Sequence, residues 1–170
     1  MSALVFTVLG VDRPGLVERI SSAVTGCGGN WLGSHLSSME GCFGGLVHVA
    51  VPRHELARLV AALRELSDEG LEVSVRETVE EPAGEPYQEV ELEVIGNDRP
   101  GIVSRISHAV AARGINMLEL RTEWSSAPMA GHSIFQARAT LLVPPDASVS
   151  ALKQDLEEIA GDLMVDLRLE

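Results

Sequence analysis

The chain carries Gly-Val-Asp-Arg-Pro-Gly-Leu-Val at residues 10–17 and Gly-Asn-Asp-Arg-Pro-Gly-Ile-Val at residues 96–103, 86 positions further on. The similarity continues downstream, where the Gly-x-Asn of residues 28–30 returns at residues 114–116. A repeat of this length at one spacing indicates that the same small domain is present twice. Because the best-preserved part is a polar turn containing glycine and proline, this turn is a candidate site as well as a piece of scaffold.

The composition is that of a folded and acidic protein. The chain has 170 residues, of which 45% are hydrophobic and 22% charged, and its formal net charge is −12. Such a charge repels phosphate backbones, so direct binding of nucleic acid is disfavoured. The repeat divides the chain into units of roughly 80 residues, which bury limited apolar surface. We therefore expect each unit to depend on its twin or on another subunit.

The sequence also bears on location and on metal or redox chemistry. It has no run of 18 apolar residues and no basic N-terminal segment followed by an apolar run, so we expect a cytoplasmic protein that is neither secreted nor inserted in a membrane. Cys27 and Cys42 have no counterparts in the second repeat, and two free thiols are favoured over a disulfide. No zinc-like spacing of Cys or His occurs, and we expect no metal and no cofactor.

Each repeat is predicted to run as strand, helix, strand, strand, helix, strand. In the second repeat, Val90, Leu92 and Val94 alternate with glutamates, which is typical of a strand with one buried and one solvated face. Gly114 is predicted to end the first helix of that repeat, and Ser148 to cap the second. In the first repeat we expect strands at 4–9, 31–39, 46–51 and 71–76 and helices at 15–25 and 54–66.

This order of elements predicts the fold class. Such a unit closes into a four-stranded antiparallel sheet with both helices on one face, so the chain is expected to be an α+β protein with two tandem ferredoxin-like domains. Residues 79–87 are rich in Pro and Glu and predict a linker between domains at 1–78 and 88–170. The unpaired edges of such sheets favour side-by-side association of repeats or of two chains, which would make a homodimer.

The repeated turn also leads to a resemblance. A strand ending in Gly-x-Asp-Arg-Pro-Gly-Leu/Ile-Val, a helix, and Gly-x-Asn before the next strand resembles the ACT domain, a module that senses small molecules. Two copies in a chain of this length resemble the glycine cleavage system transcriptional repressor family. The Ala-Pro-Met-Ala-Gly turn at residues 127–131 and Ile-Phe-Gln-Ala at residues 134–137 are similar to that family's loop and third strand. The resemblance covers nearly the whole chain.

The resemblance implies regulation by a small amino acid, such as glycine, rather than catalysis. ACT domains hold such a ligand where domains pair, with the loop after the first strand and the start of the first helix. The first repeat has Val11 where the second has Asn97, so the second loop is expected to be the better site. A repressor role in so acidic a chain implies action through a DNA-binding protein partner. The positions that match the binding motif are Asp12, Arg13, Pro14, Gly15 and Asn30 in the first repeat and Asn97, Asp98, Arg99, Pro100, Gly101 and Asn116 in the second.

The physical chemistry of the turn is compatible with that role. The start of a helix leaves backbone N–H groups unpaired and partially positive, which suits a carboxylate. Gly15 and Gly101 would let a ligand approach the backbone. Pro14 and Pro100 are expected within the first helical turn, where a missing N–H costs little.

The side chains of the turn each allow two interpretations. Asp12 and Asp98 cap their helices, which N-cap preferences favour, or receive a ligand's ammonium group. Arg13 and Arg99 clamp a carboxylate or, as we favour, form surface ion pairs. Asn116 bonds a ligand or serves as a turn residue. We expect the histidines to be ordinary solvated or packed residues, and both tryptophans to pack at a sheet face or a domain interface.

Two alternatives to an amino-acid sensor stay open. One is an allosteric or structural pairing module that acts on a metabolic enzyme. The other is an acylphosphatase-like enzyme, which shares the ferredoxin-like fold and binds phosphate through backbone N–H groups, an Arg and an Asn. The proline inside the turn and the missing longer glycine-containing phosphate loop disfavour the enzyme, and we expect a protein without catalytic activity.

Overall fold

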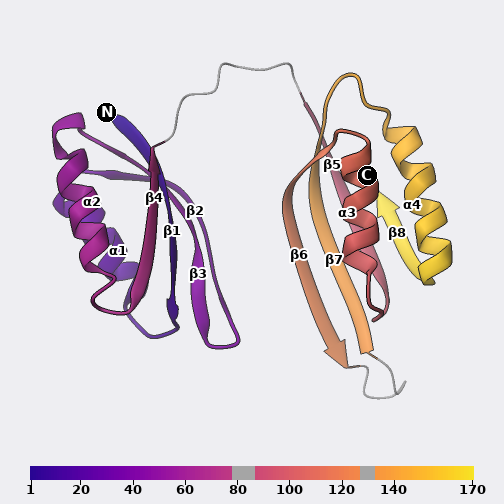
Figure 1. The fold of residues 1–170 in the computed structure, drawn as a ribbon, viewed down its shortest axis with the longest axis horizontal. Coiled ribbons are helices and arrows are strands. Elements are labelled where there is room, and N and C mark those ends of the chain that lie inside the picture. Colours follow the sequence, from indigo (N-terminus) through magenta and orange to yellow (C-terminus); the bar gives the residue numbers. More distant parts are fainter. Residues whose placement is uncertain (78–86, 127–132) are drawn as a thin grey trace. The chain divides into compact units, whose positions relative to one another are not determined.

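Two four-stranded antiparallel sheets, each covered on one face by two helices, make up the computed structural model of the chain (Figure 1). The structure describes residues 1–77, 87–126 and 133–170. The chain divides into two units, Met1–Glu81 and Pro82–Glu170. The linker sequence at 79–86 and the turn at 127–131 lie outside the described residues. Each unit has the ferredoxin-like fold, which confirms the predicted fold class.

The first unit keeps the predicted order, and its strand order is β2-β3-β1-β4. Its first strand pairs with the third from Ser2 opposite Val51 to Val11 opposite Cys42, so its end lies beside the hairpin between the second and third strands. Backbone pairing extends past the apolar alternation, which is why this strand is longer than predicted. The elements are β1 (Ser2–Val11), α1 (Leu16–Gly26), β2 (Asn30–Met39), β3 (Cys42–Val51), the 3-10 turn η1 (Arg53–Glu55), α2 (Leu56–Glu65) and β4 (Leu71–Glu77).

The second unit repeats this arrangement with the strand order β6-β7-β5-β8. Two predicted helix ends are confirmed. Gly114 follows the first helix with a left-handed φ of 67°, and the Ser148 hydroxyl accepts a hydrogen bond from the Ala151 N–H at 3.3 Å. The elements are β5 (Gln88–Asn97), α3 (Ile102–Ala112), β6 (Asn116–Ser126), β7 (Ser133–Val143), α4 (Val149–Leu163) and β8 (Val165–Leu169).

Each unit has its own hydrophobic core between its sheet and its helices. In the first unit Phe6, Leu59 and Leu63 are fully buried, and in the second Leu141 and Leu156 are. Burial of one such side chain contributes roughly 1.5–3 kcal/mol. No charged or polar residue among those that the structure describes is buried. The helices cover one face of each sheet, so the other face is left without helices (Figure 1).

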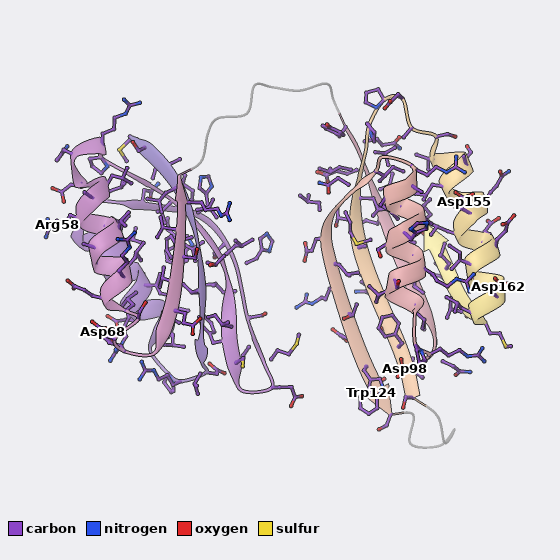
Figure 2. All side chains as sticks on the ribbon, viewed as in Figure 1. Arg58, Asp68, Asp98, Trp124, Asp155 and Asp162 are labelled. Atoms are coloured by element: carbon purple, nitrogen blue, oxygen red, sulfur yellow. The ribbon has the colours of Figure 1, made fainter. Side chains whose placement is uncertain are left out.

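A bidentate ion pair joins the two helices of the second unit. Arg113, just after α3, donates from Nε to Asp155 Oδ2 at 2.8 Å and from Nη2 to Oδ1 at 2.9 Å. Asp155 lies on α4 (Figure 2). The hydrogen bonds from Arg113 lower the pKa of the Asp155 carboxyl below its ordinary value; partial desolvation opposes this, and the guanidinium charge adds to it. The first unit has Cys27 after α1 in the place of this arginine.

This ion pair predicts a pH-dependent loss of stability in an Asp155→Asn variant. A carboxylate whose pKa is depressed in the folded state stabilises the fold above its unfolded-state pKa, and that stabilisation is lost as the pH falls through the folded-state pKa. The variant should therefore melt below the wild type at pH 7, and the difference should close on acidification. Thermal melts from pH 7 to pH 2 measure it. Glu158→Gln on the same helix is the control, and a difference that persists unchanged at pH 2 would contradict the prediction.

Two glycines with open space around them predict opposite effects of an added methyl group. At Gly101 and Gly161 an added Cβ meets no atom within 4 Å, but Gly101 has a φ of 95°. Gly161→Ala in α4 should stabilise the chain by about 0.5–1 kcal/mol, because glycine is a poor helix former. Gly101→Ala should destabilise it by about 1–2 kcal/mol, because L-residues are strained in the left-handed region. Denaturant unfolding measures both, and two shifts of the same sign would be inconsistent with this geometry.

Candidate functional site

In each unit the repeated turn forms a corner between the first strand and the first helix. We call residues 12–15 the first corner and residues 98–101 the second corner. In the first corner, the Asp12 N–H donates to the Gly41 carbonyl at 2.8 Å. The Ser38 hydroxyl donates to Asp12 Oδ2 at 2.6 Å. Both bonds fasten the corner to the hairpin between β2 and β3, and the second one occupies the Asp12 carboxylate.

The second corner has the same backbone tie and a different side-chain neighbour. The Asp98 N–H donates to the Ser133 carbonyl at 2.9 Å. Trp124 stands opposite Phe135 in the sheet, as Ser38 stands opposite Phe43 in the first unit, so a tryptophan replaces the serine that bonds Asp12. Among the described residues, the Asp98 carboxylate has no hydrogen-bond donor. Asp98 and Trp124 lie at the same end of the second sheet (Figure 2).

The helices begin at a left-handed glycine rather than at a capping side chain. Gly15 and Gly101 are the N-cap residues, with φ of 93° and 95°, and neither helix has a side-chain cap. The Gly101 carbonyl already accepts the first helical bond, from the Arg105 N–H at 2.9 Å. The predicted capping by the two aspartates is therefore wrong, because each aspartate lies three residues before the N-cap. The prolines also precede the glycines, so their predicted place in the first helical turn is wrong as well.

The two corner arginines brace the corners against the segment before the last strand of each unit. Arg13 Nη2 donates to the Glu69 carbonyl. Arg99 Nη2 lies 3.7 Å from the sulfur of Met164. Within the part of the chain that the structure describes, neither arginine forms an ion pair, so the predicted surface ion pairs are wrong. These contacts hold the corners in place, and they turn both guanidinium groups toward the segment before the last strand.

The next arginines of the repeat form the ion pairs instead. Arg19 pairs with Glu69, and Arg105 Nη2 lies 2.8 Å from Asp162 Oδ2. The first pair joins α1 to the segment after α2, and the second joins α3 to the last turn of α4. Sequence reasoning missed them because the acidic partners lie far along the chain. The two acids stand near the ends of the second helices but not at equivalent positions of the repeat, so the repeat itself gives no signal for these pairs.

The asparagines of the two Gly-x-Asn motifs do not lie at the corners of their own units. Asn30 pairs with Ala50, which pairs with Ala3 at the start of β1. Asp12 follows the other end of that strand, about 30 Å away at roughly 3.3 Å per residue. Asn116 lies in the same way at the far end of the second sheet. One small ligand cannot contact a corner and the asparagine of the same unit.

The remaining predicted residues do come together. Asn97, Asp98, Pro100 and Gly101 are exposed at one end of the second unit, and Arg99 is half-buried. The first-turn amides of α3 have no acceptor within the helix, so they carry a partial positive charge; Asp98, whose carboxylate has no donor among the described residues, lies three residues before the N-cap of that helix. An apolar crevice of ≈ 10 Å³ lies between α3 and the sheet; it begins at Ile102, which follows the second corner, and no residue of the corner itself lines it. Its lining includes Ile102, Val103, Leu120 and Phe135.

The described residues show neither a metal centre nor a membrane span. No group of three or more His, Cys, Asp or Glu side chains among them could hold a metal ion. None of their helices is both long enough and apolar enough to cross a bilayer. Cys27 is buried and Cys42 is exposed, and both are free thiols, as predicted. Trp31 packs against the first core, as predicted, whereas Trp124 is 62% exposed on its own sheet, and its place at a domain interface stays a prediction.

Comparison with known proteins identifies the kind of domain. Residues 2–76 match the ACT domain family. No curated protein matches the chain in sequence. A protein of unknown function from Galdieria sulphuraria has 28% sequence identity to the chain and a TM-score of 0.85, with 99% of this chain and 97% of that chain covered.

A second solved structure is a proposed glycine cleavage system transcriptional repressor. It has 22% sequence identity and a TM-score of 0.68, with 99% of this chain and 96% of that chain covered. At this identity the similarity concerns the fold. The family match covers the first unit, and the internal repeat and the two structures show that the second unit repeats its fold, so the chain is a tandem of two ferredoxin-like units of which the first matches the ACT domain family.

Proposed function

We propose that this chain is a non-catalytic regulatory protein that binds a small amino acid, glycine or one of similar size, and controls transcription through a protein partner. The observation that carries the proposal is the second corner, where one four-residue turn holds the uncapped start of α3 and an Asp98 carboxylate that has no hydrogen-bond donor among the described residues. The match of residues 2–76 to the ACT domain supports a sensing role for this turn. The proposed repressor among the structures that share the fold supports the link to transcription.

The second corner offers complementary groups to both ends of an amino acid. A ligand carboxylate would accept hydrogen bonds from the first-turn N–H groups of α3, where the helix dipole favours negative charge. The ligand ammonium would pair with the Asp98 carboxylate, and the Asn97 amide would supply a further donor or acceptor. The first corner has Val11 in place of Asn97 and a carboxylate already bonded to Ser38, so the proposal makes it the weaker site.

The size of the crevice supports a ligand with a very small side chain. A space of ≈ 10 Å³ is about what one water molecule needs, so it has no room for a leucine or phenylalanine side chain. Glycine needs no side-chain pocket at all. We therefore expect glycine, alanine and serine to bind more tightly than amino acids with larger side chains.

The charge of the chain supports action through a partner. A formal net charge of −12 opposes contact with DNA phosphates. A regulator of transcription with this surface would act on a DNA-binding protein, to which it would transmit the presence of the amino acid.

Isothermal titration of the full chain with the twenty amino acids tests the binding proposal. Glycine or another small amino acid should bind, and Asp98→Asn should weaken that binding about 10- to 100-fold, because hydrogen bonds to charged groups are worth roughly 1.5–3 kcal/mol. Asp12→Asn should weaken it less. Asp146→Asn removes an exposed carboxylate outside both corners and serves as the control. Absence of binding by all twenty amino acids, or equal affinity for Asp98→Asn and the wild type, would refute the proposed site.

Capture of partners from the native cell tests the second half of the proposal. The tagged chain should retain a DNA-binding transcription regulator, and the amount retained should change when the bound amino acid is added. The chain alone should not shift a DNA fragment in a gel. Retention of a metabolic enzyme in place of a transcription regulator would instead favour an allosteric module.

A further inference from the structure

A tryptophan near the second corner is largely exposed. Trp124 is 62% exposed, although tryptophan side chains are highly buried on average. It stands opposite Phe135 in the pairing of β6 with β7. Phe135 shares its face of the sheet with the buried Ala137 and Ala139, because residues two apart on a strand point to the same side. The indole therefore leaves the sheet on the helix-covered face, at the end where Asp98 lies (Figure 2).

The start of α3 faces the same part of the sheet. Ile102 and Val103, the first two residues of the helix, line the apolar crevice together with Phe135. Residues directly opposite each other in an antiparallel pair have Cβ atoms about 4.5–5.5 Å apart, so Trp124 is a close neighbour of one residue of that lining. The indole and the uncapped first turn of α3 thus share one end and one face of the sheet.

The first unit shows what a side chain at this position can reach. Ser38 has in the first sheet the place that Trp124 has in the second, since each stands opposite a phenylalanine that pairs with the glycine near the end of the central strand. From that place the Ser38 hydroxyl donates to Asp12 Oδ2 at 2.6 Å. A side chain at position 124 therefore starts within reach of the Asp98 carboxylate. The exchange of serine for tryptophan removes a hydroxyl donor and supplies an aromatic ring.

We propose that Trp124 is a specificity-determining residue of the second corner, and that its indole ring contacts the ammonium group of the bound amino acid. The inference rests on the proposed function. The face of an aromatic ring attracts a cation within about 6 Å of its centre, and tryptophan is the best such ring. A carboxylate and an indole at one end of the sheet recognise a positive group together. The corner then selects ligands that carry an ammonium group over simple carboxylic acids.

The corner arginine is directed elsewhere. Arg99 Nη2 lies 3.7 Å from the sulfur of Met164, the residue before β8. Trp124 lies on β6, at the opposite edge of the sheet from β8. A guanidinium between Asp98 and the indole would occupy both groups, because arginine pairs with carboxylates and stacks on aromatic rings. The contact with Met164 directs Arg99 toward β8 and leaves this place to the cationic group of a ligand.

Three substitutions at position 124 test the inference by calorimetry with glycine, or with the small amino acid that the wild type binds most tightly. Trp124→Phe keeps an aromatic face and should stay within about threefold of the wild-type affinity. Trp124→Ala should weaken binding about 3- to 30-fold, which is the range of a cation–π contact. Trp124→Ser should weaken it further, because the new hydroxyl would bond Asp98 as Ser38 bonds Asp12. Leu118→Ala, which truncates another exposed side chain of β6, is the control and should bind like the wild type.

Fluorescence gives a second readout, which a merely structural role would not change. The chain has two tryptophans, and Trp31 packs against the core of the first unit. The ligand should change the emission of the wild type, and Trp124→Phe should abolish this change while it still binds. Acetate carries the carboxylate without the ammonium group, and it should bind at least about tenfold more weakly than glycine.

The outcomes separate this inference from the proposed function. Wild-type affinity in both Trp124→Ala and Trp124→Ser would overturn the role of Trp124 and leave the amino-acid site in place. Emission that does not change when the wild type binds its ligand would overturn it as well, and this readout needs no variant that might fail to fold. Acetate that binds as tightly as glycine would refute recognition of the ammonium group. Absence of binding by all twenty amino acids would overturn both the inference and the proposed function.

Discussion

The left-handed backbone of Gly15 and Gly101 is the constraint on which the candidate site depends. Each glycine turns the chain from the end of a central strand into the first helix, with φ of 93° and 95°. This turn leaves the first helical amides without a side-chain cap, because the preceding aspartate lies too far back to reach them. A capped helix start would offer a ligand fewer free donors.

The fold follows from local patterns, and the site follows from them only in part. Alternation in β5 and the cap at Ser148 depend on neighbours within a few residues, so the sequence predicts them correctly. The partners of Arg13 and Arg99 lie 56 and 65 residues away along the chain. Local sequence patterns do not predict contacts over such separations. The expectation that Asn30 lies at the corner of its own unit was wrong because of the chain topology. In a strand–helix–strand crossover the second strand starts at the opposite end of the sheet from the turn, a fact that the motif spacing does not express.

Duplication has kept the backbone of the two units and changed their surfaces. Both corners tie the aspartate N–H to a carbonyl of the neighbouring hairpin, at 2.8 and 2.9 Å. The side chain beside that aspartate is Ser38 in one unit and Trp124 in the other, so one carboxylate is occupied and the other has no donor among the described residues. The sheets differ in the same manner: β1, β2 and β3 carry no Asp, Glu, Lys or Arg, whereas β5 and β7 carry the bonded pair Glu93 and Arg138. The proposed ligand site accordingly falls on the second unit.

The separate cores have a consequence for how such a chain can change. No buried residue of the first core belongs to the second. A cavity-forming substitution at Leu59 therefore weakens the packing around α2 without touching the side chains around α4. Mutational damage is compartmentalised, and one half of the chain can accumulate substitutions while the other retains its task.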